Sequence, residues 1–417
     1  MANGLTSCSV SRCPWHAVAI GAALMMAVVG LAACVEQKPI APPIPTPFPT
    51  RTPVLWPTLT SPPTPTYRAT VTPTATLSPT ATLIPTATLT PTITPTPTLS
   101  PNAITAETAR QVRDVLILDG RRLGGVWGVD VSPDARLIAV ATTRWSVFLF
   151  DAQTGDLLRE LEHHRDTVYA VAFTPDSSRL ISGSRDRTIQ VWDPWTGERL
   201  YGARAGGEVS QVAVSPEGRR VAGVGFFSAI GEVWQITDAA SLFNIEGHNV
   251  RLRSVAWSPD NRWFASGDSD GIVLLHDPQT GQVVQTIGPV IEGATALAFS
   301  PTGDTLAVGT SRGVIGLWKI EGLRLDASWA GHSGNVLDLA FSPDGSLLVT
   351  TGDDGMIRLW NVAGLSGVTG VGQAVQQRLA SLGGHGATVR SLAFSRDGST
   401  LVSGGDDGRV FVWRVAP

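Results

Sequence analysis

Four stretches of the sequence repeat the residue types of a hydrolase triad. Each has a histidine, a serine or threonine 18 residues later, an aspartate four residues after that, and a tryptophan or histidine six further on. Serine, histidine and aspartate in contact can form a nucleophile with its general base. An enzyme needs one such site, so fourfold repetition argues against catalysis. The sets are His164, Ser182, Asp186 and Trp192; His248, Ser266 and Asp270, with His276 at the tryptophan position; His332, Thr350, Asp354 and Trp360; and His385, Ser403, Asp407 and Trp413.

Two acidic turns invite comparison with calcium sites. Residues 268–271 read Asp-Ser-Asp-Gly and residues 353–355 read Asp-Asp-Gly. A calcium loop of the EF-hand type needs further oxygen ligands and a glutamate at its twelfth position, which both turns lack. Aspartate and glycine are also the ordinary residues of tight turns. We therefore expect no metal site here, and the absence of any cofactor motif predicts no cofactor.

The chain repeats itself seven times after its first quarter. A Ser/Thr-Pro element recurs every 41 to 43 residues. An aromatic residue or histidine stands at six positions spaced 42 residues apart, and a seventh such position lies near the end. Short apolar alternations, such as 168–173 and 188–192, are separated by turn residues. Four short strands per unit, seven times over, predict an all-β, seven-bladed β-propeller of four-stranded antiparallel blades. The prolines are Pro133, Pro175, Pro216, Pro259, Pro301 and Pro343; the second series is Phe150, Trp192, Trp234, His276, Trp318, Trp360 and Trp413.

The repeats resemble those of the WD-repeat family. The marks of that family are a Gly-His pair before the first strand and a Trp-Asp pair ending the third. Gly-His occurs at 247–248, 331–332 and 384–385, and Trp192-Asp193 is a complete Trp-Asp pair. The resemblance implies that the four polar sets are buried hydrogen-bond chains, each fixing one turn of a blade. By sequence spacing, valine replaces the hydroxyl residue in the other three repeats, at Val140, Val224 and Val308.

The ends of the repeat region predict how the ring closes. The last repeat stops after its third strand, and residues 114–118 (Asp-Val-Leu-Ile-Leu) can supply the missing one. A strand from the N-terminal side would then complete the last blade and leave no open sheet edge. The only irregularity in length is 11 extra residues in the glycine-rich stretch 363–379.

The resemblance also implies a binding face, formed by the loops before the first strand and between the second and third strands of each blade. Mapped onto this chain, the first four repeats contribute aromatic residues and arginines there, whereas the last two contribute acids. Tryptophan, tyrosine and arginine are enriched in binding hot spots. We therefore expect a protein or peptide to dock here, although some of these aromatic side chains could instead pack between blades. The candidates are Trp127, Arg144, Trp145, Tyr169, Arg185, Phe226, Phe227 and Arg253.

The N-terminal segment reads as an export signal. Residues 17–33 form an uncharged apolar run after Arg12, and the run closes on Leu-Ala-Ala-Cys at 31–34. This ending resembles the lipobox of bacterial lipoproteins, which implies cleavage before a lipidated Cys34. The other reading is an uncleaved N-terminal helix. We expect a signal peptide at 1–33 and a lipidated mature N-terminus at 34–38, with no thiol left for a disulfide.

A linker of biased composition follows. Residues 39–101 contain 18 prolines and 20 threonines in 63 positions, so they cannot build a packed core. Proline favours extended conformations, and the segment should act as a semi-rigid spacer. We place the propeller at 102–417, where 34 acidic and 27 basic residues give a mildly acidic domain. That balance argues against a nucleic-acid partner.

Together these features predict a non-catalytic scaffold for protein–protein interaction. We expect a monomeric propeller that is tethered by lipid in a bacterial cell envelope, on the extracytoplasmic side of the membrane. The alternative is a propeller that binds or senses a carbohydrate or another small ligand, because Trp127, Trp145 and Phe227 could equally stack on sugars. An enzyme is the weakest reading, since no unrepeated catalytic set is present.

Overall fold

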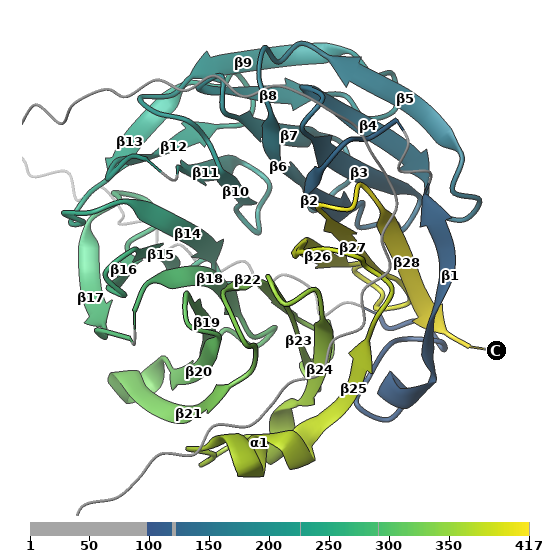
Figure 1. Ribbon diagram of the computed structural model, residues 1–417. Coiled ribbons are helices and arrows are strands. Elements are labelled where there is room, and N and C mark those ends of the chain that lie inside the picture. Colours follow the sequence, from purple (N-terminus) through teal and green to yellow (C-terminus); the bar gives the residue numbers. More distant parts are fainter. Residues whose placement is uncertain (1–97, 119–121, 226, 291, 417) are drawn as a thin grey trace, which may run out of the picture. The chain divides into compact units, whose positions relative to one another are not determined.

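The computed structural model describes residues 98–118, 122–225, 227–290 and 292–416. The signal segment 1–33, Cys34 and most of the linker 39–101 lie outside the described residues, and so does Phe226. The described chain forms seven four-stranded antiparallel sheets that surround a central axis (Figure 1). The prediction of a seven-bladed β-propeller is confirmed.

The strands of blades 1 to 6 follow one another from the axis outward, in chain order. Blade 1 contains β2 (Val126–Val131), β3 (Leu137–Thr142), β4 (Ser146–Asp151) and β5 (Leu157–Glu162). Blade 2 contains β6 (Val168–Phe173), β7 (Leu180–Ser184), β8 (Thr188–Trp192) and β9 (Arg199–Arg204). Blade 3 contains β10 (Gln211–Val214), β11 (Arg220–Val224), β12 (Gly231–Gln235) and β13 (Ser241–Ile245).

The next three blades repeat this plan. Blade 4 contains β14 (Leu252–Trp257), β15 (Phe264–Asp268), β16 (Val273–His276) and β17 (Val283–Ile287). Blade 5 contains β18 (Ala294–Phe299), β19 (Thr305–Thr310), β20 (Val314–Lys319) and β21 (Arg324–Ala330). Blade 6 contains β22 (Val336–Phe341), β23 (Leu347–Gly352), β24 (Ile357–Asn361) and β25 (Arg378–Leu382).

Blade 7 closes the ring as predicted. It contains β26 (Val389–Phe394), β27 (Leu401–Gly405) and β28 (Val410–Val415), and its outer strand is β1 (Val112–Leu118). β1 begins two residues earlier than expected and pairs Val112 with Val415 and Leu118 with Val410. The segment before it is also fixed, since Ile104 is 1% exposed and its amide donates to Gly398 O at 2.8 Å.

The second strand of each blade lies between neighbouring strands and between neighbouring blades. All six residues of β3 are buried, and the five residues of β7 are buried as well. Strands covered on both faces read as continuous apolar or small residues, whereas the outer strands β5, β9 and β17 expose most of theirs. The core is therefore a ring of apolar layers between blades.

The Ser/Thr-Pro turns, and the turn that starts with Ser395 in blade 7, link the first two strands of each blade. In blade 6, Ser342 Oγ accepts from the amide of Leu347 at 2.9 Å and donates to Asp344 at 2.5 Å. Gly345 has φ = 73°, a conformation that other residues adopt only with strain. The turn residues seen in the sequence thus have specific tasks in holding each hairpin.

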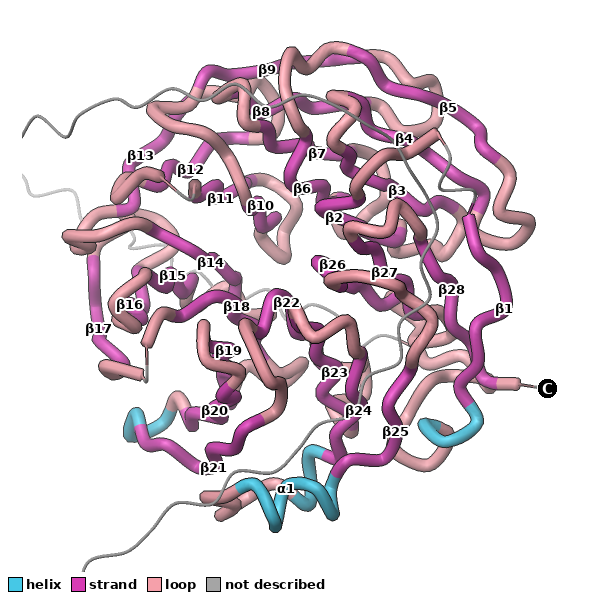
Figure 2. Tube along the Cα trace, in the orientation of Figure 1, coloured by secondary structure: helices cyan, strands magenta, loops and turns pink. Residues whose placement is uncertain are grey.

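The four helical segments of the described residues lie on the outside of blades 5 to 7 (Figure 2). They are the 3₁₀-helices η1 (Ala109–Gln111), η2 (Glu321–Leu323) and η3 (Val362–Gly364), and the α-helix α1 (Val371–Gln377). Among the described residues, no helix is long and apolar enough to span a membrane.

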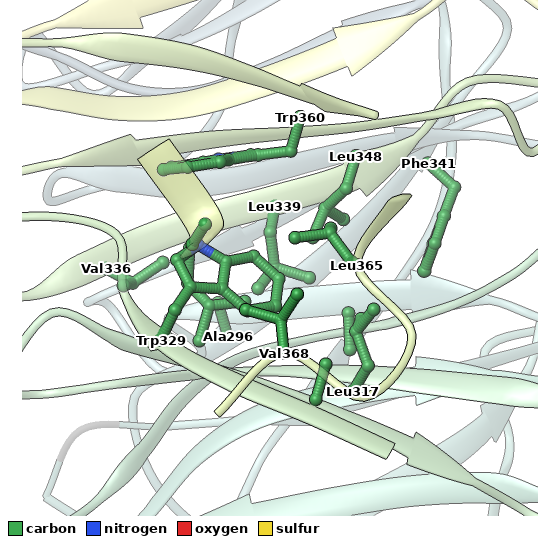
Figure 3. Packing of buried hydrophobic residues seen from close by; sticks show 14 residues of the cluster. Ala296, Leu317, Trp329, Val336, Leu339, Phe341, Leu348, Trp360, Leu365 and Val368 are labelled. Carbon is green, nitrogen blue, oxygen red and sulfur yellow. The ribbon is translucent and has the colours of Figure 1, made fainter. Parts of the chain in front are cut away.

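The extra residues 363–379 cover the outer edge of blade 5. Ser328 N, on β21, donates to Val368 O at 2.7 Å, and Gly367 N donates to Asp326 O at 3.0 Å. Leu365 and Val368 join the apolar cluster that contains Trp329; Val368 lies against the Trp329 indole, and Leu365 lies beside Leu348 (Figure 3). The insertion therefore shields part of an outer strand that the other blades leave exposed.

Candidate functional site

Seven residues at or next to the starts of the innermost strands, one from each blade, line a central cavity of about 290 Å³. Each follows a loop from the previous blade, so the ring brings together residues from every blade of the propeller. Three of the predicted binding residues, Trp127, Tyr169 and Arg253, are among them. The seven are Trp127, Tyr169, Ser210, Arg253, Thr295, Leu337 and Arg390.

Trp127 is held between two other cavity residues. The ring of Tyr169 meets it edge-on, with 4.7 Å between the centroids and 61° between the planes. Arg390 Cζ lies 3.6 Å from the Trp127 ring centroid, a cation–π contact, and the guanidinium is fixed by a two-pronged ion pair with Asp406. A Trp–Tyr–Arg cluster therefore bridges blades 7, 1 and 2 at the axis.

The turns between second and third strands lie on the same side of the ring as these strand starts. The turn after β3 is joined to the loop before β2 by Thr143 N, which donates to Gly125 O at 3.0 Å. The turn after β7 is joined in the same way, because Arg185 N donates to Thr167 O at 2.9 Å. We call this side, with its central cavity and its turns, the channel face.

The rim of the channel face carries exposed side chains from blades 1 to 3. Trp145 is 54% exposed and Phe227 is 73% exposed, and Arg144 and Arg185 are also exposed. Trp145 has φ = 67°, in the left-handed region that bulky residues seldom adopt. Phe226 lies outside the described residues. The predicted candidates thus divide into a central group and a peripheral group.

Two aspartates in the channel were not predicted. Asp130 Oδ2 accepts from Phe173 N at 2.7 Å, and Asp338 Oδ2 accepts from Leu392 N at 2.9 Å, so each joins its blade to the next. Burial raises the pKa of Asp130 to about 7, against the lowering effect of its amide bonds. Burial likewise raises the pKa of Asp338 to about 6. The signal in the sequence is an acid on an inner strand, where Asp130 replaces the alanine of the other repeats.

Arg253 brings a cation to the same cavity. Burial lowers the pKa of its guanidinium, and the charge of Arg251 lowers it further. Arginine nevertheless stays charged at any physiological pH. The channel therefore contains fixed positive charge from Arg253 and Arg390 beside two carboxyl groups that are readily protonated.

The polar sets of blades 2, 6 and 7 form continuous hydrogen-bond chains. In blade 2, Trp192 Nε1 donates to Ser182 Oγ at 2.9 Å, Ser182 Oγ lies 2.7 Å from His164 Nε2, and His164 Nδ1 lies 3.0 Å from Asp186. Blade 6 repeats the chain through Thr350, and blade 7 repeats it through Ser403. The hydroxyl residues are fully buried, so they cannot attack an external substrate. Each aspartate also accepts the backbone amide after its histidine, at Arg165, Ser333 and Gly386.

The set in blade 4 differs from the prediction. Asp268 and not Asp270 binds His248 Nδ1, at 2.7 Å, and Asp270 is exposed. Asp268 occupies the place of Ser184 in blade 2, and its second oxygen accepts from the turn amides of Asp270 and Ile272. One buried carboxylate therefore holds both the histidine and the turn. The prediction of Asp270 followed sequence spacing and was wrong because an acid two residues earlier reaches the same imidazole.

His276 replaces tryptophan in that blade. Its Nε2 lies 2.7 Å from Ser266 Oγ, which is also 2.7 Å from His248 Nε2. Its Nδ1 lies 3.1 Å from the carbonyl oxygen of Gly281. Burial lowers the pKa of His276 to about 4, so the ring is neutral at pH 7. A serine hydroxyl has one proton, so it can donate to only one of the two imidazoles.

Blades 1 and 5 lack the chain and bury valine at the hydroxyl position, as predicted. Val140 and Val308 are at most 1% exposed. In blade 1 the tryptophan position holds Phe150, which has no N–H group and needs no acceptor. An apolar residue at the hydroxyl position therefore leaves no indole unpaired in that blade.

Glycine, and not valine, takes the hydroxyl position of blade 3. In blade 2, Leu180 pairs with Trp192, and the hydroxyl residue Ser182 comes two residues after Leu180. In blade 3, Val221 pairs with Trp234, so the equivalent position is Gly223. The prediction of Val224 was wrong because the segment from β11 to β12 is one residue longer. The indole covers Gly223, where a Cβ would lie 2.7 Å from Trp234 Cζ3. The buried Nε1 of Trp234 has no acceptor among the described residues.

No group of three or more histidine, cysteine, aspartate or glutamate side chains is placed to hold a metal ion within the described part of the chain. The described geometry provides groups that suit noncovalent binding. The channel face combines rigid aromatic rings, guanidinium groups and a hollow, all positioned by turns that the polar sets and backbone bonds fix.

Comparison with known proteins agrees with the blade pattern. The family model described as "WD domain, G-beta repeat" matches residues 155–193, 240–277, 324–361 and 376–414. Each match runs from the outer strand of one blade through the first three strands of the next. The matched blades are 2, 4, 6 and 7, the four that contain a histidine–hydroxyl–aspartate chain.

Curated relatives share part of this region. Small ribosomal subunit protein RACK1y of Oryza sativa is 32% identical over 172 residues, which are 39% of this chain and 50% of that protein. A guanine nucleotide-binding protein subunit beta of Oryza sativa is 29% identical over 177 residues, 38% of this chain and 46% of its own. Pre-mRNA-processing factor 19 homolog 2 of Arabidopsis thaliana is 25% identical over 51% of this chain and 33% of its own length. The chain thus spans half or less of these relatives, and four of its seven blades match WD repeats.

Proposed function

We propose that this chain is a non-catalytic scaffold that binds a protein or peptide across the channel face of its propeller. The observation that carries the proposal is the cluster of Trp127, Tyr169 and Arg390 at the central cavity, flanked by the exposed rings of Trp145 and Phe227. Rigid aromatic and arginine side chains give large contact area at low entropic cost, which is why they dominate binding hot spots. One relative is named as a small ribosomal subunit protein and another as a guanine nucleotide-binding protein subunit beta, which supports an interaction role.

The proposal includes a place in the cell. The apolar run 17–33 and its Leu-Ala-Ala-Cys ending support a lipid anchor at Cys34 in a bacterial envelope. Residues 39–101 would then be the spacer that presents the propeller outside the cytoplasmic membrane. Labelling of growing cells with a tagged fatty acid tests this part. Label should enter the chain and be lost from a Cys34→Ala variant, and label that persists in that variant would overturn the anchor.

A pull-down with the full-length chain tests the docking face. The bait is cross-linked in an envelope extract beside a Phe227→Ala/Arg185→Glu variant, which removes one exposed ring and reverses one rim charge. The matched control is Tyr201→Ala, because Tyr201 is 42% exposed on the outer strand β9. A partner captured by the native chain and the control, but lost from the rim variant, supports the proposal. Equal capture by all three chains would contradict it.

One observation favours a second function, the binding of a carbohydrate or small ligand. The central cavity is lined by Trp127 and Tyr169 and by polar groups of Ser210 and Thr295, a combination that suits a sugar ring. Thermal-shift screening of glycans on the full-length chain distinguishes the two. A glycan that raises Tm in the native chain but not in Trp127→Ala would favour the second function.

A further inference from the structure

A second cavity lies on the flank of blade 2, away from the central one. It also measures about 290 Å³, and none of its lining residues belongs to the channel cavity. Its walls come from β8, β9, the turn between β7 and β8, and the loop between β5 and β6. The residues that line it are His163, Arg165, Asp186, Thr188, Gln190, Arg199, Gly202, Ala203 and Arg204.

Positive charge dominates this cavity. Arg165, Arg199 and Arg204 are all exposed on it, and none of them forms a salt bridge with a carboxylate within the described residues. The one acid, Asp186, is already engaged by His164, by the amides of Arg165 and Thr188, and by the Thr188 hydroxyl. Its acceptor capacity is therefore used by the protein, and the cavity is lined by three arginines.

The floor of the cavity fixes one of these guanidinium groups. Arg199 Nε donates to Gln190 Oε1 at 2.6 Å, and Gln190 Nε2 donates to Thr188 Oγ1 at 3.1 Å. Gly202 lies opposite Gln190 across the β8–β9 pair, and a Cβ there would clash with Gln190 Oε1 and come within 2.6 Å of Arg199 Nη2. The glycine thus leaves room for Arg199 to reach across the strand.

We propose that this cavity binds a phosphate group, either free or as a monoester. Guanidinium forks match the oxygens of phosphate in pairs, and several cations favour a dianion over a carboxylate. The site goes beyond the docking face, since it uses Arg199 and Arg204 of the outer strand. Its failure would leave the proposed scaffold function untouched.

The histidine in the wall provides a direct readout. Burial lowers the pKa of His163, the charges of Arg199, His164 and Arg165 lower it further, and Asp186 opposes them. A bound anion would stabilise the imidazolium form and raise this pKa. Anion binding can therefore be followed through the His163 pKa, without any assay of activity.

The test is a histidine NMR titration of the full-length chain, with the His163 signal assigned from a His163→Gln variant. Inorganic phosphate should raise the His163 pKa by about half a unit or more in a saturable way, relative to chloride at equal ionic strength. Arg199→Gln and Arg204→Gln should each weaken binding about fivefold or more, and Gly202→Ala should weaken it by filling the floor. Arg136→Gln, on a turn of blade 1, is the matched control and should leave binding unchanged.

Two results would overturn the proposal. One is a His163 titration that phosphate at about 20 mM shifts no more than chloride does. The other is a loss of binding in Arg136→Gln equal to that in Arg199→Gln, because this would indicate nonspecific attraction. A parallel titration with O-phosphoserine distinguishes the two forms: a response to phosphate alone limits the site to the free ion, and a response to both shows that it also accepts a phosphate monoester.

Discussion

Phe264 and His276 stack face to face in the core of blade 4, with 4.5 Å between ring centroids and 8° between ring planes. They are paired across β15 and β16. The equivalent pairs in blades 2, 6 and 7 join a leucine to a tryptophan, so the smaller imidazole is balanced by a larger partner. Those pairs are Leu180 with Trp192, Leu348 with Trp360, and Leu401 with Trp413.

This exchange of sizes predicts strong coupling between the two positions. His276→Trp alone should overpack against Phe264 and cost about 1 to 3 kcal/mol of unfolding free energy. Phe264→Leu alone should leave a gap and cost about 1 kcal/mol or more. The double variant should recover most of both losses, since its indole can also donate to Ser266. Denaturant unfolding of all four chains measures the coupling, and simple additivity would contradict the argument.

The corrected acid of blade 4 gives a second prediction. Asp268→Ala should destabilise the chain by about 2 to 4 kcal/mol at pH 7, because it strips a buried histidine and two turn amides of their acceptor. Asp270→Ala, two residues away and exposed, should change stability by less than about 0.5 kcal/mol. Tm values of the two variants test this prediction. A similar decrease in Tm for both variants would contradict the assignment of Asp268 as the partner of His248.

The channel aspartates predict a pH dependence with a definite sign. The pKa of Asp130 is about 7 in the folded chain and about 3.8 when exposed, so folding takes up a proton between these values. Stability from this group is therefore present at low pH and falls as pH rises through the window. The Asp130→Asn substitution removes the ionisable group, so the unfolding free energy of this variant relative to the native chain should be higher at pH 8 than at pH 4.5, by about 3 kcal/mol. Parallel stability curves between these pH values would contradict it.

The unpaired indole of blade 3 predicts a difference between two otherwise identical substitutions. Trp192→Phe removes an indole that donates to Ser182, whereas Trp234→Phe removes a buried N–H group that has no acceptor among the described residues. Both variants lose similar ring area, but only the first loses a hydrogen bond. The blade 2 variant should therefore lose about 1 kcal/mol more unfolding free energy than the blade 3 variant. Urea unfolding of both chains provides the comparison, and an equal loss would show that the Trp234 N–H group costs nothing.

The sequence predicted the ring because its signals are periodic. Turn prolines near every 42nd residue and the tryptophan positions indicate seven four-stranded units. The last unit lacks one strand, so the extra strand before the first unit was expected to complete it. The candidates Trp127, Tyr169 and Arg253 followed from the same period. That these residues line one cavity could not be read from the period, because the closed ring brings Trp127 of blade 1 into contact with Arg390 of blade 7.

What the sequence could not predict depends on distances that spacing does not encode. Asp268 and Asp270 are equally plausible partners of His248 until the turn places one of them inside. Asp130 is a single departure from alanine, and its role depends on a hydrogen bond from the amide of Phe173 in the neighbouring blade. The cavity beside Arg199 could not be predicted, because its lining side chains come from four different segments.

The most direct test of the docking face is site-specific photo-cross-linking from the full-length chain in the native envelope. A photoreactive residue is placed at position 145, 227 or 201, the last on the outer strand β9. The account predicts one shared cross-linked partner from 145 and 227 and none from 201. Cross-links from 201 alone, or equally from all three positions, would contradict a partner bound on the channel face.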